Sequence, residues 1–255
     1  MIVIDKICYN SKLRYVNTRL KLIFTILTLI ICIISKSFYV SSIVFIVNSV
    51  LNLYWAKISL YQYVKLILLP VAFIILSTLA IVIDVTPSPA ENYYLYLFNL
   101  YFSININSVL YGLQIFATAI SSVTCLYFLT LNTTMTDLLN ELYALKCPVI
   151  VCELMMLIYR FIFVLTESAD NINVAQISRL GNKNFIISCK SFAMLVSVVF
   201  IKSIKKSNIL FDAMESRCYD GRINVITAEN ELNKKYLLLI IVFEILLVLI
   251  TLLGA

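Results

Sequence analysis

The 255-residue sequence contains no histidine, and it has only four glycines and four prolines. Without histidine the common catalytic triads are excluded, as are zinc sites that rely on imidazole ligands. So few glycines and prolines argue against long disordered tails. Charged residues are also scarce, at 13% of the chain, whereas a soluble domain has about a quarter. A soluble core could not bury the remaining apolar surface, so lipid must surround much of the chain.

Two motifs are also missing from the printed sequence. It has no Gly-x-x-x-x-Gly-Lys-Ser/Thr phosphate loop, so the chain cannot itself be an ATP-driven motor. It has no Cys-x-x-Cys pair, which argues against a metal site or a disulfide framework. We therefore expect no cofactor and no metal, and we predict that the cysteines are small apolar packing residues in a reducing environment. The seven cysteines are Cys8, Cys32, Cys125, Cys147, Cys152, Cys189 and Cys218.

Hydrophobic residues make up 62% of the chain, and they are concentrated in long runs. A membrane-spanning helix needs about 20 mostly apolar residues. The sequence therefore predicts an all-α polytopic membrane protein with about five transmembrane helices and further long helices on the cytoplasmic side. The predicted spans are Leu20–Ser35, Phe38–Trp55, Val64–Ile83, Asn107–Leu131 and Tyr236–Leu253.

Positive charge predicts the orientation in the cell membrane. No Lys or Arg lies between Leu66 and Leu145, and twelve of the twenty lie between Lys146 and Lys235. By the positive-inside rule the N-terminus and residues 132–235 are cytoplasmic. We predict a membrane region over 1–131, a cytoplasm-facing module over 132–222, and a linker with the last span over 223–255. Three lysines at 202, 205 and 206 could bind anionic lipid or simply enforce this topology.

The cytoplasm-facing region divides into three predicted helices. Met135–Lys146 is short and amphipathic, and Pro148 follows its end. A helix of about 30 residues runs from Val149 to Leu180, and another runs from Phe185 to Cys218. The apolar core of the third helix, Ser191–Ile201, is too short for a span, so we expect an interfacial or protein-buried helix.

The second of these helices carries three charged residues on one face. Glu153, Arg160 and Glu167 are spaced seven apart. They could form a carboxylate centre of an intramembrane enzyme, although we favour a seam of ion pairs within a helix bundle. Glu244, in the middle of the last predicted span, is a further functional candidate, and we expect it to pair with a polar group on a neighbouring helix.

Both long helices end in the same kind of tripeptide, namely Ser178-Arg179-Leu180 and Ser216-Arg217-Cys218. One interpretation is that each Arg only complements the helix macrodipole, which is worth about 0.3–1 kcal/mol. The other is that the paired guanidinium groups dock on acidic grooves of a cytoplasmic partner, because guanidinium stays charged and binds carboxylates with two hydrogen bonds.

Several stretches resemble one known family. The N-terminal residues 4–22, the segment Leu129–Leu139 with Pro148, and Tyr159-Arg160-Phe161 with Glu167 are similar to the T component of energy-coupling factor transporters. The resemblance is strongest to the cobalt-type CbiQ proteins. Residues 213–222, Ala-Met-Glu-Ser-Arg-Cys-Tyr-Asp-Gly-Arg, resemble the family's Ala-x-x-Ala-Arg-Gly-Tyr-x-Gly-Arg. Ser216 and Cys218 replace the usual Ala and Gly.

This resemblance implies a coupling subunit that is not an enzyme. Its partners would be two ATP-binding cassette subunits, a small substrate-binding membrane subunit and the lipid bilayer, and we expect no nucleic-acid partner. Arg179 and Arg217 would correspond to the family's coupling arginines, with Ser178, Leu180, Ser216 and Cys218 beside them. Cobalt uptake is implied, although nickel or vitamins through a shared module remain alternatives. A secondary transporter is the alternative of another class, but the sequence lacks the internal repeats and the broken spans of that class.

Overall fold

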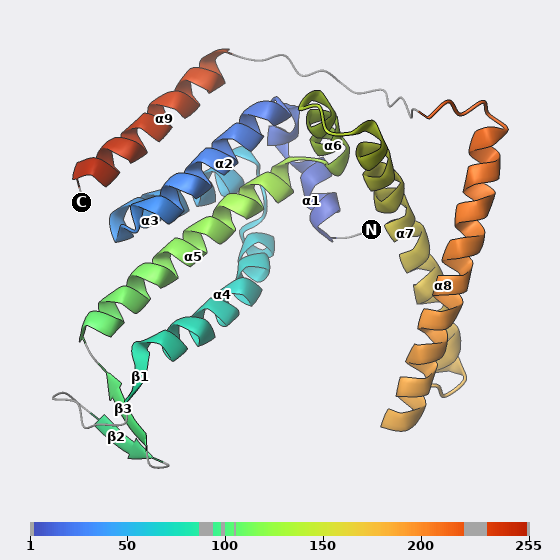
Figure 1. The fold of residues 1–255 in the computed structure, drawn as a ribbon, viewed down its shortest axis with the longest axis horizontal. Coiled ribbons are helices and arrows are strands. Elements are labelled where there is room, and N and C mark those ends of the chain that lie inside the picture. The colour runs from blue at the N-terminus through green and yellow to red at the C-terminus, as the bar shows by residue number, and fades with distance from the viewer. Residues whose placement is uncertain (1–2, 87–93, 98–99, 105, 222–233, 254–255) are drawn as a thin grey trace. The chain divides into compact units, whose positions relative to one another are not determined.

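The computed structural model describes residues 3–86, 94–97, 100–104, 106–221 and 234–253 (Figure 1). The described chain divides into two compact units. The larger unit consists of residues 3–134 and 234–253, and the smaller unit consists of residues 135–221.

The larger unit is a bundle of long apolar helices. Its long helices coincide with the five predicted spans to within a few residues at each end, so the helical membrane fold predicted from the sequence is confirmed. Asn17 starts α2, because its side-chain oxygen accepts a 2.9 Å hydrogen bond from the Arg19 amide. The elements are α1 (Val3–Asn10), the 3-10 turn η1 (Lys12–Tyr15), α2 (Thr18–Ser35), α3 (Phe38–Val50) with its π-helical continuation η2 (Leu51–Trp55), α4 (Leu60–Val82), α5 (Ile106–Asn132) and α9 (Lys234–Leu253).

Helix α5 is the centre of this bundle and contacts α1, α2, α3 and α4. Small residues let the neighbouring backbones approach it closely, as is common between helices in lipid. Ser121 on α5 donates a 2.6 Å hydrogen bond to the Ser41 carbonyl on α3. A Cβ at Gly112 would lie 2.5 Å from Cγ2 of Val82 on α4, so any larger residue there would push α4 and α5 apart.

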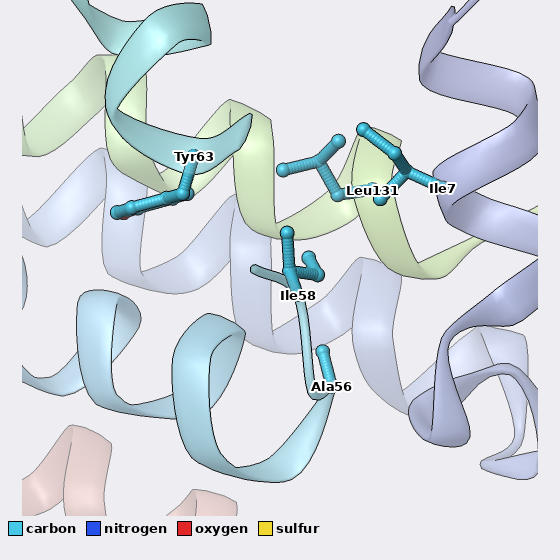
Figure 2. Close-up of a cluster of buried hydrophobic side chains, with 5 residues drawn as sticks. All are labelled: Ile7, Ala56, Ile58, Tyr63 and Leu131. Atoms are coloured by element: carbon cyan, nitrogen blue, oxygen red, sulfur yellow. The ribbon is translucent and has the colours of Figure 1, made fainter. Parts of the chain in front are cut away.

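Two clusters of buried side chains hold the bundle together. The first lies where α1, α5, α4 and the turn after α3 meet (Figure 2). The second joins α2, α3, α5 and α9, which ties the last helix of the sequence to the first half of the chain. The first cluster contains Ile7, Ala56, Ile58, Tyr63 and Leu131, and the second contains Val40, Val44, Cys125 and Leu247.

A small antiparallel sheet follows α4, and the sequence analysis did not predict it. Its strands are β1 (Ile83–Thr86), β2 (Tyr94–Leu97) and β3 (Leu100–Ile104), in the order β1-β3-β2. Asp84 pairs with Ser103, and Tyr94 also pairs with Ser103 on the other side of β3. Strands of four or five residues carry too little periodicity to be distinguished from a loop in the sequence.

The smaller unit contains α6 (Met135–Ala144), α7 (Val149–Ser178) and α8 (Phe185–Glu215). Helix α7 contacts both of the others. Seven described helices are long and apolar enough to cross a membrane, namely the five predicted spans together with α7 and α8. Length and composition therefore do not separate α7 and α8 from true spans, and their position on the cytoplasmic side stays a prediction from charge.

All seven cysteines are free thiols. Cys8, Cys32, Cys125 and Cys152 are buried, as expected for packing residues. The expectation is wrong for Cys189 and Cys218, which are exposed. The reason is that none of the residues of α8 is buried within the chain, so a cysteine on or just after this helix has no core to pack into.

Candidate functional site: the two ends of a helical hairpin

Helices α7 and α8 form an antiparallel hairpin, which descends along α7 and returns along α8 (Figure 1). The turn between them is fixed by side chains of both helices. Gln176 Nε2 donates a 2.9 Å hydrogen bond to the Ser191 carbonyl, and Ser191 Oγ donates a 2.9 Å hydrogen bond to the Gly181 carbonyl. The end of α7 is therefore held against the second turn of α8.

Helix α7 ends in a Schellman motif that contains Arg179. Leu180 has a positive φ of 60°. The Leu180 amide donates to the Ile177 carbonyl at 3.0 Å and the Gly181 amide donates to the Gln176 carbonyl at 2.8 Å. Gly181 is required here by close approach, because a Cβ would lie 2.8 Å from the Gln176 carbonyl oxygen and 2.9 Å from Ser191 Oγ.

Helix α8 ends in the same motif around Arg217. Cys218 has a φ of 58°, and its amide donates to the Glu215 carbonyl at 3.0 Å. The Tyr219 amide donates to the Met214 carbonyl at 3.1 Å. Arg179 and Arg217 therefore occupy equivalent positions, each directly before the left-handed residue that closes its helix.

The six residues of the two tripeptides are all exposed in the structure. The left-handed conformation of Leu180 and Cys218 is unfavourable for residues other than glycine, by about 1–2 kcal/mol each. That cost exceeds the roughly 0.3–1 kcal/mol gained when a cation lies at a helix C-terminus. Both interpretations of the Ser-Arg-x ends, a cation at a helix C-terminus and a docking group for a partner, therefore stay predictions. The six residues are Ser178, Arg179, Leu180, Ser216, Arg217 and Cys218.

Because the hairpin is antiparallel, the two arginines lie at its opposite ends. A helix of 30 residues such as α7 is about 45 Å long at 1.5 Å per residue. One hairpin thus presents two guanidinium groups of identical local geometry, separated by about the length of a helix. A single binding pocket therefore cannot hold both guanidinium groups.

The Arg217 end of α8 is attached to the start of α7. The Tyr219 hydroxyl donates a 2.7 Å hydrogen bond to Oε2 of Glu153, whose side chain is only 8% exposed. This bond to a carboxylate, together with its negative charge, raises the pKa of Tyr219 above its usual value. Tyr219 belongs to the motif over residues 213–222, but its partner Glu153 is 66 residues away, and local sequence patterns do not reveal a contact over that distance.

The three charged residues of the predicted ion-pair seam differ in their exposure to solvent. Glu153 is buried, whereas Arg160 and Glu167 are exposed. A spacing of seven residues separates successive side chains by about 10.5 Å along one helix, which is too far for direct pairing among the three. Their pairing therefore stays a prediction, and it would involve groups outside this set of residues.

A buried polar network joins two of the stretches that carried the family resemblance. The Lys21 side chain is 3% exposed, and its Nζ donates to the carbonyls of Asn132 at 2.8 Å and Leu13 at 3.2 Å. The Asn132 side chain accepts from Ser11 Oγ at 2.6 Å and donates to Asn52 Oδ1 at 2.8 Å. The N-terminal segment is thereby anchored to the last residue of α5, three residues before the smaller unit begins.

The described residues contain no group of three or more His, Cys, Asp or Glu side chains that could hold a metal ion. The hairpin carries an exposed arginine at each end.

Comparison with known proteins gives a family match over most of the chain. Residues 9–227 match the family model CbiQ, described as a cobalt transport protein. The uncharacterized protein MJ1089 of Methanocaldococcus jannaschii is 37% identical over 139 residues, which are 54% of this chain and 52% of that protein. A putative fused cobalt transport protein CbiMQ of Methanocorpusculum labreanum is 38% identical over 121 residues, or 48% of this chain and 20% of that protein.

A third similar protein is the energy-coupling factor transporter transmembrane protein EcfT of Ruminiclostridium cellulolyticum, which is 38% identical over 89 residues, or 33% of each chain. The chain spans about half the length of the first of these relatives and a fifth of the length of the second.

Proposed function

Because the chain belongs to the CbiQ family of cobalt transport proteins, we propose that it is the coupling subunit of an energy-coupling factor importer. In this role it transmits the opening and closing of two ATP-binding subunits to a small membrane subunit that captures substrate. The family is a membrane component of transporters and not an enzyme, so ATP hydrolysis belongs to the partners.

The observation that carries this proposal is the pair of equivalent arginine-bearing helix ends on one hairpin. Two ATP-binding subunits offer two similar grooves, and Arg179 and Arg217 present the same backbone geometry to each. An acidic groove would bind either guanidinium through two parallel hydrogen bonds. The length of the hairpin allows both grooves to be occupied at once, so a change in their separation would tilt or shift the hairpin as a lever.

The lever requires that the ends of the hairpin move together. Gln176 and Ser191 fix the Arg179 end, and Tyr219 and Glu153 fix the Arg217 end. Both attachments are hydrogen bonds between α7 and α8, so a force applied to either arginine is passed to both helices. Apolar side chains along α8 that are exposed within the chain, such as Phe192 and Phe200, suit a lipid or membrane-subunit environment.

We assign the transported substrate as cobalt because of the family to which the chain belongs. Nickel or a vitamin, delivered through a shared module, is the alternative. We place the N-terminus and the hairpin on the cytoplasmic side of the cell membrane, where ATP-binding subunits have access to them.

The proposal is tested by purifying the tagged chain from its native membrane in a mild detergent. The double variant Arg179→Glu/Arg217→Glu should lose the ATP-binding subunits while it still inserts in the membrane, because loss of a buried interfacial charge typically costs about 2–5 kcal/mol. The matched control is Lys183→Glu/Lys190→Glu, which makes the same change of charge at exposed positions of the same hairpin. Equal recovery of the ATP-binding subunits with both variants would refute the coupling assignment.

A further inference from the structure

Lys57 lies in the short turn between η2 and α4, with a left-handed φ of 56°. The residues on either side of it are buried, because Ala56 is only 1% exposed and Ile58 only 6% exposed. Both belong to the first buried cluster, together with Ile7 (Figure 2). Since its two neighbours pack into the bundle, Lys57 stands out from the bundle and is exposed.

Lys12 has an equivalent position in the N-terminal segment. It is the first residue of η1, where the Ser11 side chain accepts a 3.2 Å hydrogen bond from the Leu13 amide. Ser11 is 3% exposed, and Leu13 packs against the same buried cluster. Lys12 is therefore also an exposed cation between two anchored residues.

Buried hydrogen bonds hold the turns that carry these two lysines together. Ser11 Oγ donates a 2.6 Å hydrogen bond to Asn132 Oδ1, and Asn132 Nδ2 donates a 2.8 Å hydrogen bond to Asn52 Oδ1. The Asn52 carbonyl in turn accepts a 3.3 Å hydrogen bond from the Ile58 amide. Two buried asparagines thus link the N-terminal segment to the turn before α4.

The two lysine side chains meet at the surface above this network. Lys12 shares a side-chain hydrogen bond with Lys57, and this contact, together with the repulsion of like charges, lowers the pKa of Lys12. A dominant neighbouring carboxylate would raise that pKa instead. Two charged ammonium groups cannot hydrogen-bond to each other, because neither has an acceptor. An anion that accepts hydrogen bonds from both nitrogens would remove the repulsion and leave both groups charged.

The pair lies at the depth of lipid headgroups. Trp55 and Leu60 are ends of two helices that are long and apolar enough to cross a membrane, and Lys57 lies between them. A turn of this length between two spans stays at the membrane surface. The aromatic rings of Tyr54, Trp55 and Tyr61 are 74%, 49% and 76% exposed, as expected for an interfacial belt. The anion most abundant at this depth is the phosphate of a lipid.

We propose that Lys12 and Lys57 together bind the phosphate of an anionic phospholipid headgroup. Both ammonium groups donate to phosphate oxygens, and their two positive charges favour an anionic lipid over a zwitterionic lipid. The bound lipid would fasten both the N-terminal segment and the turn between η2 and α4 to the membrane surface. This site involves no ATP-binding subunit, so it stands whether or not the proposed coupling role does.

Thermal unfolding of the full chain in dodecyl maltoside micelles tests the site, with dioctanoyl phosphatidylglycerol as the added lipid. At ten times its dissociation constant this lipid should raise the Tm of the wild type by about 3–6 °C. The variant Lys12→Gln/Lys57→Gln should lose most of this rise. The matched control Arg19→Gln/Lys36→Gln also removes two exposed cations and should keep the rise. Lys36, just before the other end of α3, shares the left-handed backbone of Lys57.

Two further ligands separate the headgroup from its parts. Dioctanoyl phosphatidylcholine and inorganic phosphate, at equal ionic strength, should leave the Tm of the wild type nearly unchanged. An equal rise with phosphatidylcholine would show that the acyl chains carry the binding, and an equal rise with inorganic phosphate would show a site for free anions. Either result, or a full rise in Lys12→Gln/Lys57→Gln, would overturn the proposal. If the double variant does not fold, a full rise in both single variants would overturn it equally.

Discussion

The hydroxyl of Tyr219 lies 2.7 Å from Oε2 of Glu153. This hydrogen bond joins Tyr219, two residues after Arg217, to the second turn of α7. At the other end of the hairpin the Gln176 side chain makes the corresponding attachment to the Ser191 carbonyl. Each arginine therefore belongs to a helix end that is fixed to the partner helix, as a lever needs.

Removing the Tyr219 hydroxyl tests that attachment. We expect Tyr219→Phe to destabilise the hairpin by about 1.5–3 kcal/mol, because it removes a hydrogen bond to the Glu153 carboxylate and hydrogen bonds to charged groups are worth that much. Hydrogen exchange measures the effect. The backbone amides of residues 149–160 should exchange faster in Tyr219→Phe than in the wild type. Tyr143→Phe, at an exposed position of α6, is the control. Unchanged exchange in Tyr219→Phe would show that the bond does not hold the helix.

The same hydrogen bond predicts a response to alkaline pH. The pKa of Tyr219 is raised by Glu153, so the folded protein holds the hydroxyl proton more tightly than the unfolded chain does. Its contribution to stability is fully present below the ordinary tyrosine pKa of about 10 and is lost as pH rises through the raised value. The difference in tyrosinate absorbance between wild type and Tyr219→Phe should titrate above pH 10. A titration below that pH would contradict the bond.

The two exposed cysteines, Cys189 within α8 and Cys218 just after it, should respond to glycine in opposite directions. Cys218 has a φ of 58°, so Cys218→Gly removes strain and should raise the free energy of unfolding by about 1 kcal/mol. Cys189 lies inside the helix, so Cys189→Gly should lower it by about 0.5–1 kcal/mol. Thermal unfolding in nanodiscs measures both. A loss of stability in both variants would show that the left-handed residue is not strained.

The sequence predicted the long helices of the larger unit well and the contacts between helices poorly. Uninterrupted apolar runs set the ends of α2, α3, α5 and α9, because lipid requires a helix of fixed length. The family resemblance to CbiQ, first drawn from short motifs, is confirmed by a match over residues 9–227. The strands of the small sheet are too short to show the alternation of apolar and polar residues that predicts a strand.

The residues of the candidate site stay a prediction, and the sequence did not predict their geometry. The repeated Ser-Arg-x pattern located Arg179 and Arg217, yet nothing in the spacing predicted that Leu180 and Cys218 are both left-handed. The bond between Tyr219 and Glu153 spans 66 residues, and local periodicity carries no information over that distance. The expected polar partner of Glu244 is likewise missing from the described residues.

If ATP-binding subunits cover both arginine ends of the hairpin, thiols placed beside the two arginines should be shielded from labelling in the complete complex. Cys218, next to Arg217, is a natural exposed probe, and Leu180→Cys in a Cys189→Ser background places a second probe next to Arg179. Maleimide labelling of both thiols is measured in the isolated chain and in the complete complex in membranes, and the two results are compared. We expect both thiols to react readily in the isolated chain and to be protected in the complex. Equal reactivity of both thiols in the two preparations would contradict it.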